Sequence, residues 1–164
     1  MTRERKGPAY VVAQLLIIGL YLSAIRYQIF DAPIALRWIA IAGFVLGLVI
    51  MSAAAMQLNK HLSPLPKPKE KSRLITSGAY KSVRHPIYAG LALLAFAWAI
   101  LKGNPIQLAL AFALAGLLNF KAKHEEKLLE RMFSSYSVYG SKTGELLPRF
   151  FWRARKSVTA RDQL

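Results

Sequence analysis

Long, uninterrupted apolar blocks are the feature of this sequence that most restricts its fold. The first runs from Ala9 to Tyr27, with Gln14 as its only strongly polar interior residue, and the second runs from Ile34 to Leu58. At about 1.5 Å of rise per residue, each is long enough to cross a hydrocarbon core of roughly 30 Å. The second block also carries Gly43 and Gly47, small residues that let helices approach closely in lipid. The blocks predict an integral membrane protein.

Two shorter apolar blocks follow, at residues 87–101 and 106–120. Each is shorter than the usual transmembrane span of about 20 residues, so buried helices of a soluble core are an alternative interpretation. We favour a transmembrane hairpin, because both blocks lack charged residues and polar flanking residues can extend them. Lys102-Gly103-Asn104-Pro105 lies between the blocks and is typical of a tight turn.

The predicted fold is therefore an all-α membrane protein with a single domain over residues 1–164. No Gly or Pro interrupts residues 121–139, so the fourth helix is expected to continue beyond the membrane as a cytosolic helix. The basic residues 150–164 are expected to form a frayed tail or to lie on lipid headgroups. The predicted transmembrane helices are residues 9–27, 34–58, 87–101 and 106–120.

The strongly basic composition is informative about partners. The formal net charge is +15, which in a soluble protein would indicate nucleic acid, but the sequence contains no DNA- or RNA-binding motif. In a membrane protein the same charge marks the cytosolic side and attracts anionic lipids. The chain contains no cysteine, which excludes disulfides, thiolate metal sites and a cysteine nucleophile.

The distribution of the basic residues predicts the orientation. Of the 23 Lys and Arg residues, only Arg26, Arg37 and Lys102 lie on one side of the four-helix arrangement. All the others lie in the two termini, in the long loop between the second and third blocks, or beyond the fourth block. Because cytosolic segments carry the excess of Lys and Arg, both termini and the long loop are expected to be cytosolic.

A first candidate functional segment precedes the third block. Pro86 suits the first turn of a helix, which places His85 at the helix N-terminus, where free N–H groups favour an anion such as a carboxylate. Tyr88 lies close to one turn further along, and Gly78 permits a turn that brings Tyr80 back toward the helix. From spacing alone, a well-capped return of the chain into the membrane is an equal alternative.

A second candidate segment is Lys121 to Leu129, which contains the neighbouring acids Glu125 and Glu126. Lys121 and Glu125 are four residues apart and share a helix face. Ordinary pairing on a solvated helix is the alternative interpretation. That alternative is weakened by the position at the membrane edge, where charge is costly unless it is paired or functional.

Together these segments resemble the isoprenylcysteine carboxyl methyltransferase and phospholipid methyltransferase family. The resemblance covers roughly residues 58–150 and includes a Ser63–Pro68 segment similar to that of bacterial members, which implies a bacterial or archaeal inner membrane. The R-H-P-x-Y element at residues 84–88 is by itself shared with membrane-bound sterol reductases, but its combination with the paired glutamates is more specific. The motifs are G-x-Y-x-x-x-R-H-P-x-Y-x-G at 78–90, E-E-x-L-L at 125–129, F-x-x-Y-x-x-Y at 133–139 and L-L-P at 146–148.

The resemblance implies S-adenosyl-L-methionine as the cofactor, in a cytosolic pocket formed by the loop before the third helix and the extension of the fourth. It implies catalytic roles for Lys121 and Glu125, with Lys121 as a cation on the substrate side where relatives often carry Arg. Lys offers a point charge rather than a bidentate fork. The implied cofactor contacts are Leu74, Ile75, Tyr80, His85, Pro86, Ile87, Tyr88, Glu125 and Glu126.

The resemblance further implies a lipid or prenylated methyl acceptor, such as an isoprenylcysteine-like acid that is O-methylated at its carboxylate. A phospholipid amine that is N-methylated is an alternative acceptor. An NADPH-dependent reductase like the sterol reductases, or a lipid-binding membrane protein without enzymatic activity, are alternative functions. No motif of the chain indicates a metal site or a nucleic acid partner.

Overall fold

The computed structural model describes residues 6–58 and 74–149 of the chain, and these residues form helices joined by short connections. Within this part of the chain there is no strand, only a single parallel β-bridge between Val83 and Gly144. The helices in chain order are α1 (Lys6–Ser23), η1 (Ala24–Arg26), α2 (Ile34–Leu58), η2 (Gly78–Lys81), α3 (Pro86–Leu101), α4 (Pro105–Met132) and α5 (Tyr136–Lys142). The prediction of an all-α protein is confirmed.

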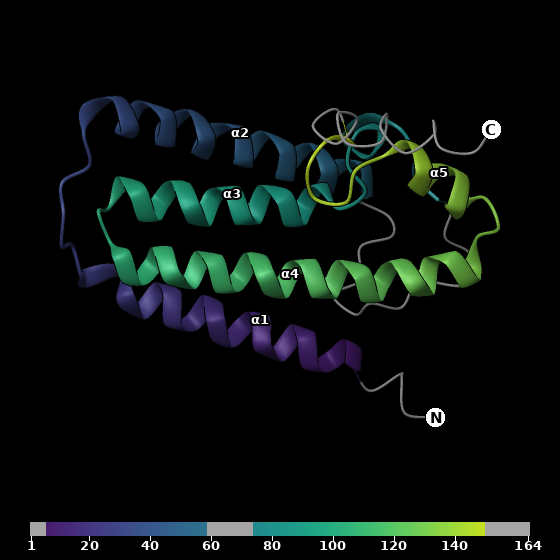
Figure 1. Cartoon of the computed structure of the whole chain (residues 1–164), viewed down its shortest axis with the longest axis horizontal. Coiled ribbons are helices and arrows are strands. Elements are labelled where there is room, and N and C mark those ends of the chain that lie inside the picture. Colours follow the sequence, from purple (N-terminus) through teal and green to yellow (C-terminus); the bar gives the residue numbers. More distant parts are fainter. Residues whose placement is uncertain (1–5, 59–73, 150–164) are drawn as a thin grey trace, which may run out of the picture.

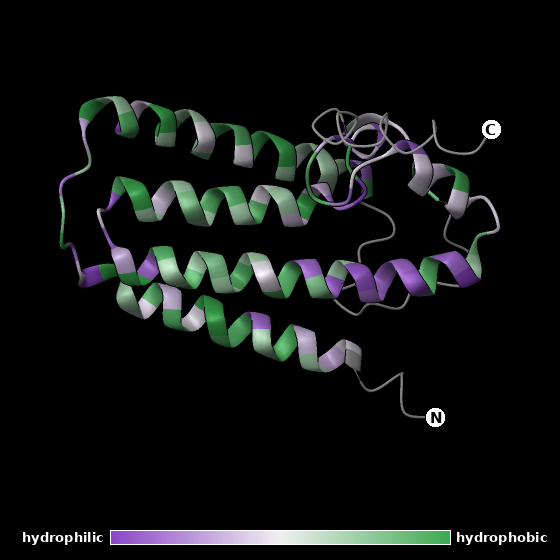
Figure 2. Ribbon diagram, in the orientation of Figure 1, coloured by the Kyte–Doolittle hydropathy of each residue, from purple (hydrophilic) through white to green (hydrophobic). Residues whose placement is uncertain are grey.

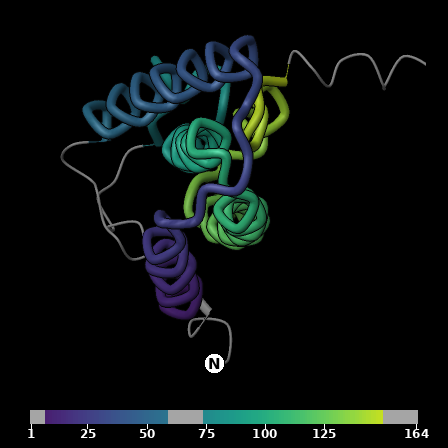
Figure 3. Tube along the Cα trace, turned by 90° about the vertical axis from the view of Figure 1, so that its left-hand side faces the viewer, coloured from purple at the N-terminus to yellow at the C-terminus, as the bar shows by residue number. Residues whose placement is uncertain are grey.

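The four long helices lie side by side in the order α2, α3, α4, α1 (Figures 1 and 3). The main helix contacts are α2 with α3, α3 with α4, and α4 with α1. The connection between α1 and α2 and the turn between α3 and α4 meet at one end of the molecule. The start of α3, the end of α2 and α5 lie toward the other end, which is called the α5 end below.

The outward faces of the helices are apolar, as a lipid environment requires. In Figure 2, α2, α3 and most of α1 are predominantly hydrophobic, and α4 is largely hydrophilic toward the α5 end. Large apolar side chains such as Leu16 on α1 and Ile39 on α2 are 63% and 67% exposed, as expected for helix faces that contact lipid. The helices α1 with η1, α2 and α4 are long and apolar enough to span a membrane. The chain is a membrane protein.

Helix α3, which contains the third apolar block, is shorter than α1, α2 and α4. Helix α3 has 16 residues, which corresponds to about 24 Å at about 1.5 Å per residue, so it is shorter than the usual span. It lies between α2 and α4, and its alanines Ala95, Ala97 and Ala99 are buried. The structure thus contains three helices of spanning length among the described residues, plus this shorter apolar helix, rather than four equivalent spans.

Helices α2 and α3 approach each other closely because small residues face each other. A Cβ atom added to Gly90 would lie 2.9 Å from the carbonyl oxygen of Gly47 and 3.1 Å from the Cβ atom of Met51. Such contacts are with the backbone and the root of a side chain, so they cannot be relieved by a rotamer change. The packing explains why glycine ends the motif that begins at Gly78.

Gly90→Ala is therefore expected to destabilise the protein by about 1–3 kcal/mol, because the added methyl group would push α2 away from α3. Thermal unfolding of the purified protein in detergent measures the effect. The matched control is Gly116→Ala in α4, where an added Cβ meets no atom within 4 Å. This control is expected to leave stability unchanged or slightly higher, since alanine favours a helix. Equal behaviour of the two variants would contradict the close α2–α3 packing.

The turn between α3 and α4 forms as predicted from Lys102 to Pro105. Gly103 has a φ of 56°, in the left-handed region that suits glycine, and its carbonyl oxygen accepts the N–H groups of Ile29 and Phe30 from the α1–α2 connection. The side chain of Asn104 caps α4 by accepting the N–H of Gln107 at 3.0 Å. Its amide donates to the carbonyl of Ala24, which ties α1 to the start of α4.

The cytosolic helix predicted for residues 121–139 is only partly correct. Helix α4 continues without interruption to Met132, but Phe133 adopts an extended conformation (φ −125°, ψ 108°) and ends it. The chain resumes as α5 only at Tyr136, because Ser134 and Ser135 favour helix ends over helix interiors. The apolar stripe of the predicted helix is therefore divided between two helices. The predicted basic tail lies outside the described residues.

Candidate functional site

The loop before α3 is held near the end of α2 by a turn at Gly78. Gly78 has a φ of 59°, and the side-chain oxygen of Gln57 accepts the N–H of the following Ala79 at 3.1 Å. This turn at a glycine, as predicted, begins η2, in which the side chain of Tyr80 is buried. Leu74 and Ile75 lie half-buried in the segment that leads into η2.

Helix α3 begins at Pro86, with His85 as the N-cap residue. The His85 side chain makes no capping hydrogen bond, and Pro86 has no N–H group to satisfy. The first turn of a helix has no intrahelical acceptor for its amide groups, so the N–H groups of Ile87 and Tyr88 point away from α3 at its positive end. This helix start can accept an anionic group at the α5 end of the molecule.

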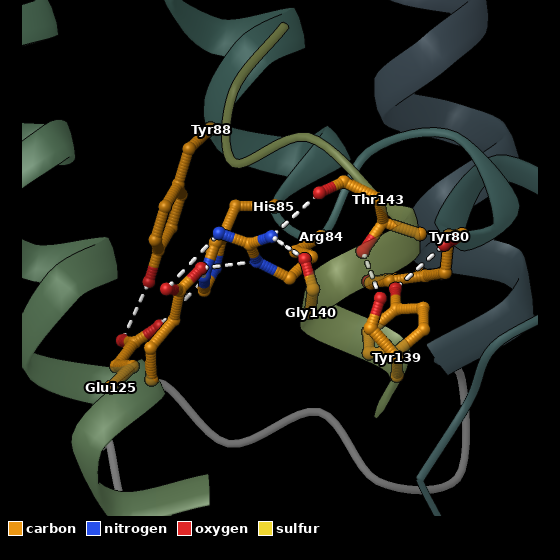
Figure 4. Close-up of polar contacts among 9 residues, drawn as sticks. Tyr80, Arg84, His85, Tyr88, Glu125, Tyr139, Gly140 and Thr143 are labelled. Carbon is orange, nitrogen blue, oxygen red and sulfur yellow. Dashed lines mark hydrogen bonds and ion pairs between the residues drawn. The ribbon is translucent and has the colours of Figure 1, made fainter. Parts of the chain in front are cut away.

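Glu125 and Glu126 of α4 both lie within 4.0 Å of His85 at this helix start, but their other partners differ. Figure 4 shows Glu125 beside Tyr88. Glu126 is held by the Arg84 guanidinium in a bidentate ion pair, with Nε to Oε1 at 2.6 Å and Nη2 to Oε2 at 3.2 Å. Glu125 accepts the hydroxyl of Tyr88 at 2.7 Å, and its other oxygen lies 3.8 Å from Nδ1 of His85. Glu126 is therefore paired with Arg84, whereas Glu125 has no Lys or Arg partner of this kind within residues 6–58 and 74–149.

His85 lies between the two acids and is 9% exposed. Its Nε2 atom lies 3.3 Å from Oε1 of Glu126, but the alignment is not that of a hydrogen bond, so this buried ring nitrogen has no hydrogen-bond partner among the described residues. The imidazole is parallel to the Tyr88 ring at a centroid distance of 5.5 Å. Buried polar atoms are usually hydrogen-bonded, so an unpaired nitrogen at a helix start fits a site that binds a polar ligand.

The end of α5 and the residues that follow it, together residues 140–145, close over Arg84. Nη1 of Arg84 donates to the carbonyl oxygens of Gly140 at 2.8 Å and of Thr143 at 2.6 Å. The backbone N–H of Arg84 donates to Gly144, and that of His85 donates to the carbonyl of Glu145. Arg84 thus connects three parts of the chain: the start of α3, the C-terminal part of α4 and the 140–145 segment (Figure 4).

Burial and neighbouring charges shift the pKa values of several groups at this end. Burial alone would lower the pKa of Arg84, but the hydrogen bond and charge of Glu126 raise that pKa above its ordinary value, so the guanidinium stays charged. Burial, with the nearby Tyr139 and Glu125, raises the pKa of Tyr80 to about 12, so its phenol is neutral at physiological pH. Burial and the proximity of Glu126 raise the pKa of Glu145 above its ordinary value.

Lys121 lies one turn before Glu125 on α4 and is largely buried. Its ammonium donates to the side-chain oxygen of Gln14 on α1 at 2.9 Å and lies 5.0 Å from the centroid of the Tyr88 ring. Lys121 therefore faces α1, while Glu125 faces α3. Both residues nevertheless contact Tyr88, as expected for residues that share a helix face. They do not form an ion pair with each other in the described structure.

The structure brings most of the predicted site residues to the α5 end. His85, Pro86, Tyr88, Glu125 and Glu126 form one cluster, and Lys121 adjoins it through Tyr88. Tyr80 is tied to α5 through its carbonyl, which accepts the Tyr139 hydroxyl at 2.6 Å.

The sequence prediction missed three parts of this arrangement, namely Arg84, Gln14 and the 140–145 segment. The sequence signal for Arg84 was its place in the R-H-P-x-Y motif, and the signal for Gln14 was a lone amide in an apolar block. No comparable signal marks the third, because Gly140, Thr143 and Gly144 contribute backbone carbonyls, which any residue carries.

A comparison with known protein families identifies one that matches most of the chain. A family model described as phospholipid methyltransferase matches residues 35–136 of the chain, which include α2, η2, α3 and α4. No curated protein matches the chain. The matched region contains the whole His85, Glu125 and Glu126 cluster, whereas α1 and the 140–145 segment lie outside it.

Proposed function

The chain belongs to the phospholipid methyltransferase family, and from that premise we propose that it transfers a methyl group from S-adenosyl-L-methionine to a lipid-like acceptor at the membrane. The family supports methyl transfer in a membrane protein. The cofactor, the acceptor and the roles of individual residues are the proposed part.

One observation carries the proposal: a carboxylate-bearing stretch of α4 meets the proline-started end of α3, with Glu125 and His85 3.8 Å apart. The cofactor has a positively charged sulfur and an amino-acid carboxylate, and it needs one negative and one positive partner. In a region rich in Lys and Arg, Glu125 supplies the negative partner. The N–H groups at the start of α3 supply the positive one.

Glu125 and Glu126 have different proposed roles because their partners differ. Glu126 is neutralised by Arg84, so it fixes the position of the helix start rather than binding a cation. Among the described residues, Glu125 is held by the Tyr88 hydroxyl and the nearby His85 and by no Lys or Arg ion pair, which leaves its charge available. Tyr80, Leu74 and Ile75 are proposed to line the cofactor pocket on the loop side, since their segment is held at the end of α2.

When bound, the cofactor supplies a methyl group on a positively charged sulfur, and transfer to oxygen forms an O–C bond as the S–C bond breaks. The protein's own contribution is alignment and the exclusion of water. A carboxylate acceptor needs no general base, and Lys121 is proposed to hold it as a cation on the acceptor side of Tyr88. An isoprenoid or other lipid acid that is O-methylated is therefore the proposed acceptor.

A phospholipid amine is a second candidate acceptor, and the phospholipid-based description of the matched family favours it. An amine must lose a proton before methylation, so a base would be required. His85 is a candidate for that base, since its ring nitrogen Nε2 has no hydrogen-bond partner among the described residues. The cytosolic orientation of the α5 end is part of the same proposal, because the sequence places the excess of basic residues there.

Incubation of the purified protein with methyl-labelled S-adenosyl-L-methionine and a total lipid extract is expected to label a lipid. A carboxyl ester releases the label as methanol in mild alkali, whereas an N-methyl group keeps it, so the two acceptor classes separate in one treatment. Absence of labelled lipid together with oxidation of added NADPH would support a reductase instead. Absence of both reactions and of cofactor binding would support a non-enzymatic lipid-binding protein.

A further inference from the structure

Gln14 is a polar residue in an apolar helix, and its partner is the candidate acceptor-side cation. Its side-chain oxygen accepts a hydrogen bond from Nζ of Lys121 at 2.9 Å, which links α1 to α4. Four residues earlier on α1, Tyr10 contacts His124, three residues after Lys121, with ring centroids 5.6 Å apart. The two contacts fix the register of α1 against the polar part of α4. Gln14 lies outside the residues that match the family.

The ammonium of Lys121 has no ion-pair partner among the described residues. The residue is 7% exposed, and its two close partners, the Gln14 amide oxygen and the Tyr88 ring, are both neutral. Glu125, one turn along α4, acts on the ammonium electrostatically, but no carboxylate of the described residues lies within the 4.0 Å ion-pair distance. A buried cation without a directly paired anion is costly, and an entering anion would lower that cost.

We propose that Gln14 is a positioning residue that holds the Lys121 ammonium away from a direct ion pair, ready for an anionic group of the methyl acceptor at the contact between α1 and α4. This inference rests on the proposed methyl transfer and specifies the charge of its acceptor. An amide suits the role because it accepts a hydrogen bond without neutralising the ammonium. A carboxylate at the same position would form an internal ion pair and compete with the acceptor.

The anion has two possible sources, a carboxylate of a lipid acid and the phosphate of a phospholipid headgroup. Both would approach Lys121 beside Tyr88, whose hydroxyl is bonded to Glu125. The acceptor would thus lie on the α1 side of Tyr88, with the proposed cofactor pocket on the α3 side. In-line transfer requires direct contact between the acceptor atom and the methyl group on the sulfur, so the two ligands would meet beside the Tyr88 ring and not across it.

Gln14→Glu is the decisive variant, because it keeps the length of the side chain and the hydrogen-bond acceptor but adds the missing negative charge. Binding to the purified protein is measured with two ligand pairs that differ in charge: an N-acetylated S-prenylcysteine and its methyl ester, and phosphatidic acid and diacylglycerol. The wild-type protein is expected to bind the acid of at least one pair about ten-fold more tightly than its neutral partner. In Gln14→Glu that preference is expected to disappear. The pair that shows the effect identifies the source of the anion.

Steady-state kinetics with the methylated acceptor provide a second readout. Gln14→Glu is expected to raise the acceptor KM by about ten-fold with little change in kcat, whereas a purely structural residue would affect stability rather than KM. Gln28→Glu is the control: Gln28 is exposed and hydrogen-bonded to Asp31 at the other end of the molecule, and its variant is expected to behave as wild type.

A wild-type protein without preference for either acid, or a Gln14→Glu variant that keeps the preference, would overturn the inference. Binding of S-adenosyl-L-methionine is measured separately for every variant and is expected to be unchanged by Gln14→Glu. Failure of the wild-type protein to bind the cofactor would overturn the proposed function itself, whatever the preference for acids, so the two failures are distinguishable.

Discussion

Glu125→Gln is expected to lower kcat/KM for methyl transfer by about 100-fold or more while the protein remains folded. Removal of one preorganised electrostatic partner in an active site costs about 10²–10³ in rate. Glutamine has the same shape and can still accept the Tyr88 hydroxyl, so the variant removes charge rather than packing. The loss is expected in cofactor binding as well as in turnover. Labelled methyl transfer to lipid and thermal unfolding in detergent measure the two quantities.

Glu130→Gln is the matched control for this prediction. Glu130 is exposed, lies on the same helix and is outside the cluster, so its variant has the same change in net charge and is expected to keep wild-type activity. Tyr88→Phe is expected to give an intermediate loss, because Glu125 would lose its 2.7 Å hydrogen bond but keep its charge. Wild-type turnover by Glu125→Gln would show that its carboxylate is an ordinary charge on a solvated helix.

Arg84→Met is expected to destabilise the protein by about 3 kcal/mol, because it leaves the Glu126 carboxylate without its permanent cation. The side chains of both partners are largely buried, at 13% and 16% exposure, so water cannot replace the lost contacts at low cost. The variant also frees the carbonyls of Gly140 and Thr143, which hold the 140–145 segment over the site. Thermal unfolding is expected to show a large fall in midpoint temperature.

Arg37→Met is the control for this ion pair. Arg37 pairs with Asp31 in an exposed position at the other end of the molecule, and exposed pairs contribute about 0–1 kcal/mol. Arg84→Lys tests the geometry, since lysine keeps the charge but cannot reach the carboxylate and the two carbonyls together. A fall in stability for Arg84→Lys close to that for Arg84→Met is expected. Equal stability of Arg84→Met and Arg37→Met would contradict the role of Arg84 as a connection between α3, α4 and the 140–145 segment.

The sequence predicted those features that depend on local chemistry. Apolar length placed α2 at 34–58, the bounds that the structure has, and Pro86 and Pro105 marked the starts of α3 and α4. Gly78 and Gly103 marked the two turns with positive φ. Each of these features follows from a conformational restriction or a solvent preference carried by the residues themselves.

The partners of the site residues could not be predicted in the same way. Arg84 and Glu126 are 42 residues apart and Lys121 and Gln14 are 107 apart, so their contacts depend on which helices are neighbours. The order α2, α3, α4, α1 is set by small-residue packing between α2 and α3 and by the Asn104 contact with η1. Equivalent apolar helices allow several such orders. For this reason the sequence predicted that Lys121 and Glu125 share a helix face, but it did not show that both residues contact Tyr88.

The most direct test is equilibrium binding of labelled S-adenosyl-L-methionine to the purified protein in detergent or lipid nanodiscs. The wild-type protein and Glu130→Gln are expected to bind the cofactor with equal affinity, and Glu125→Gln is expected to bind it at least ten-fold more weakly, which corresponds to about 1.4 kcal/mol. Absence of binding by the folded wild-type protein, or equal affinity for all three, would contradict a cofactor site between the start of α3 and Glu125.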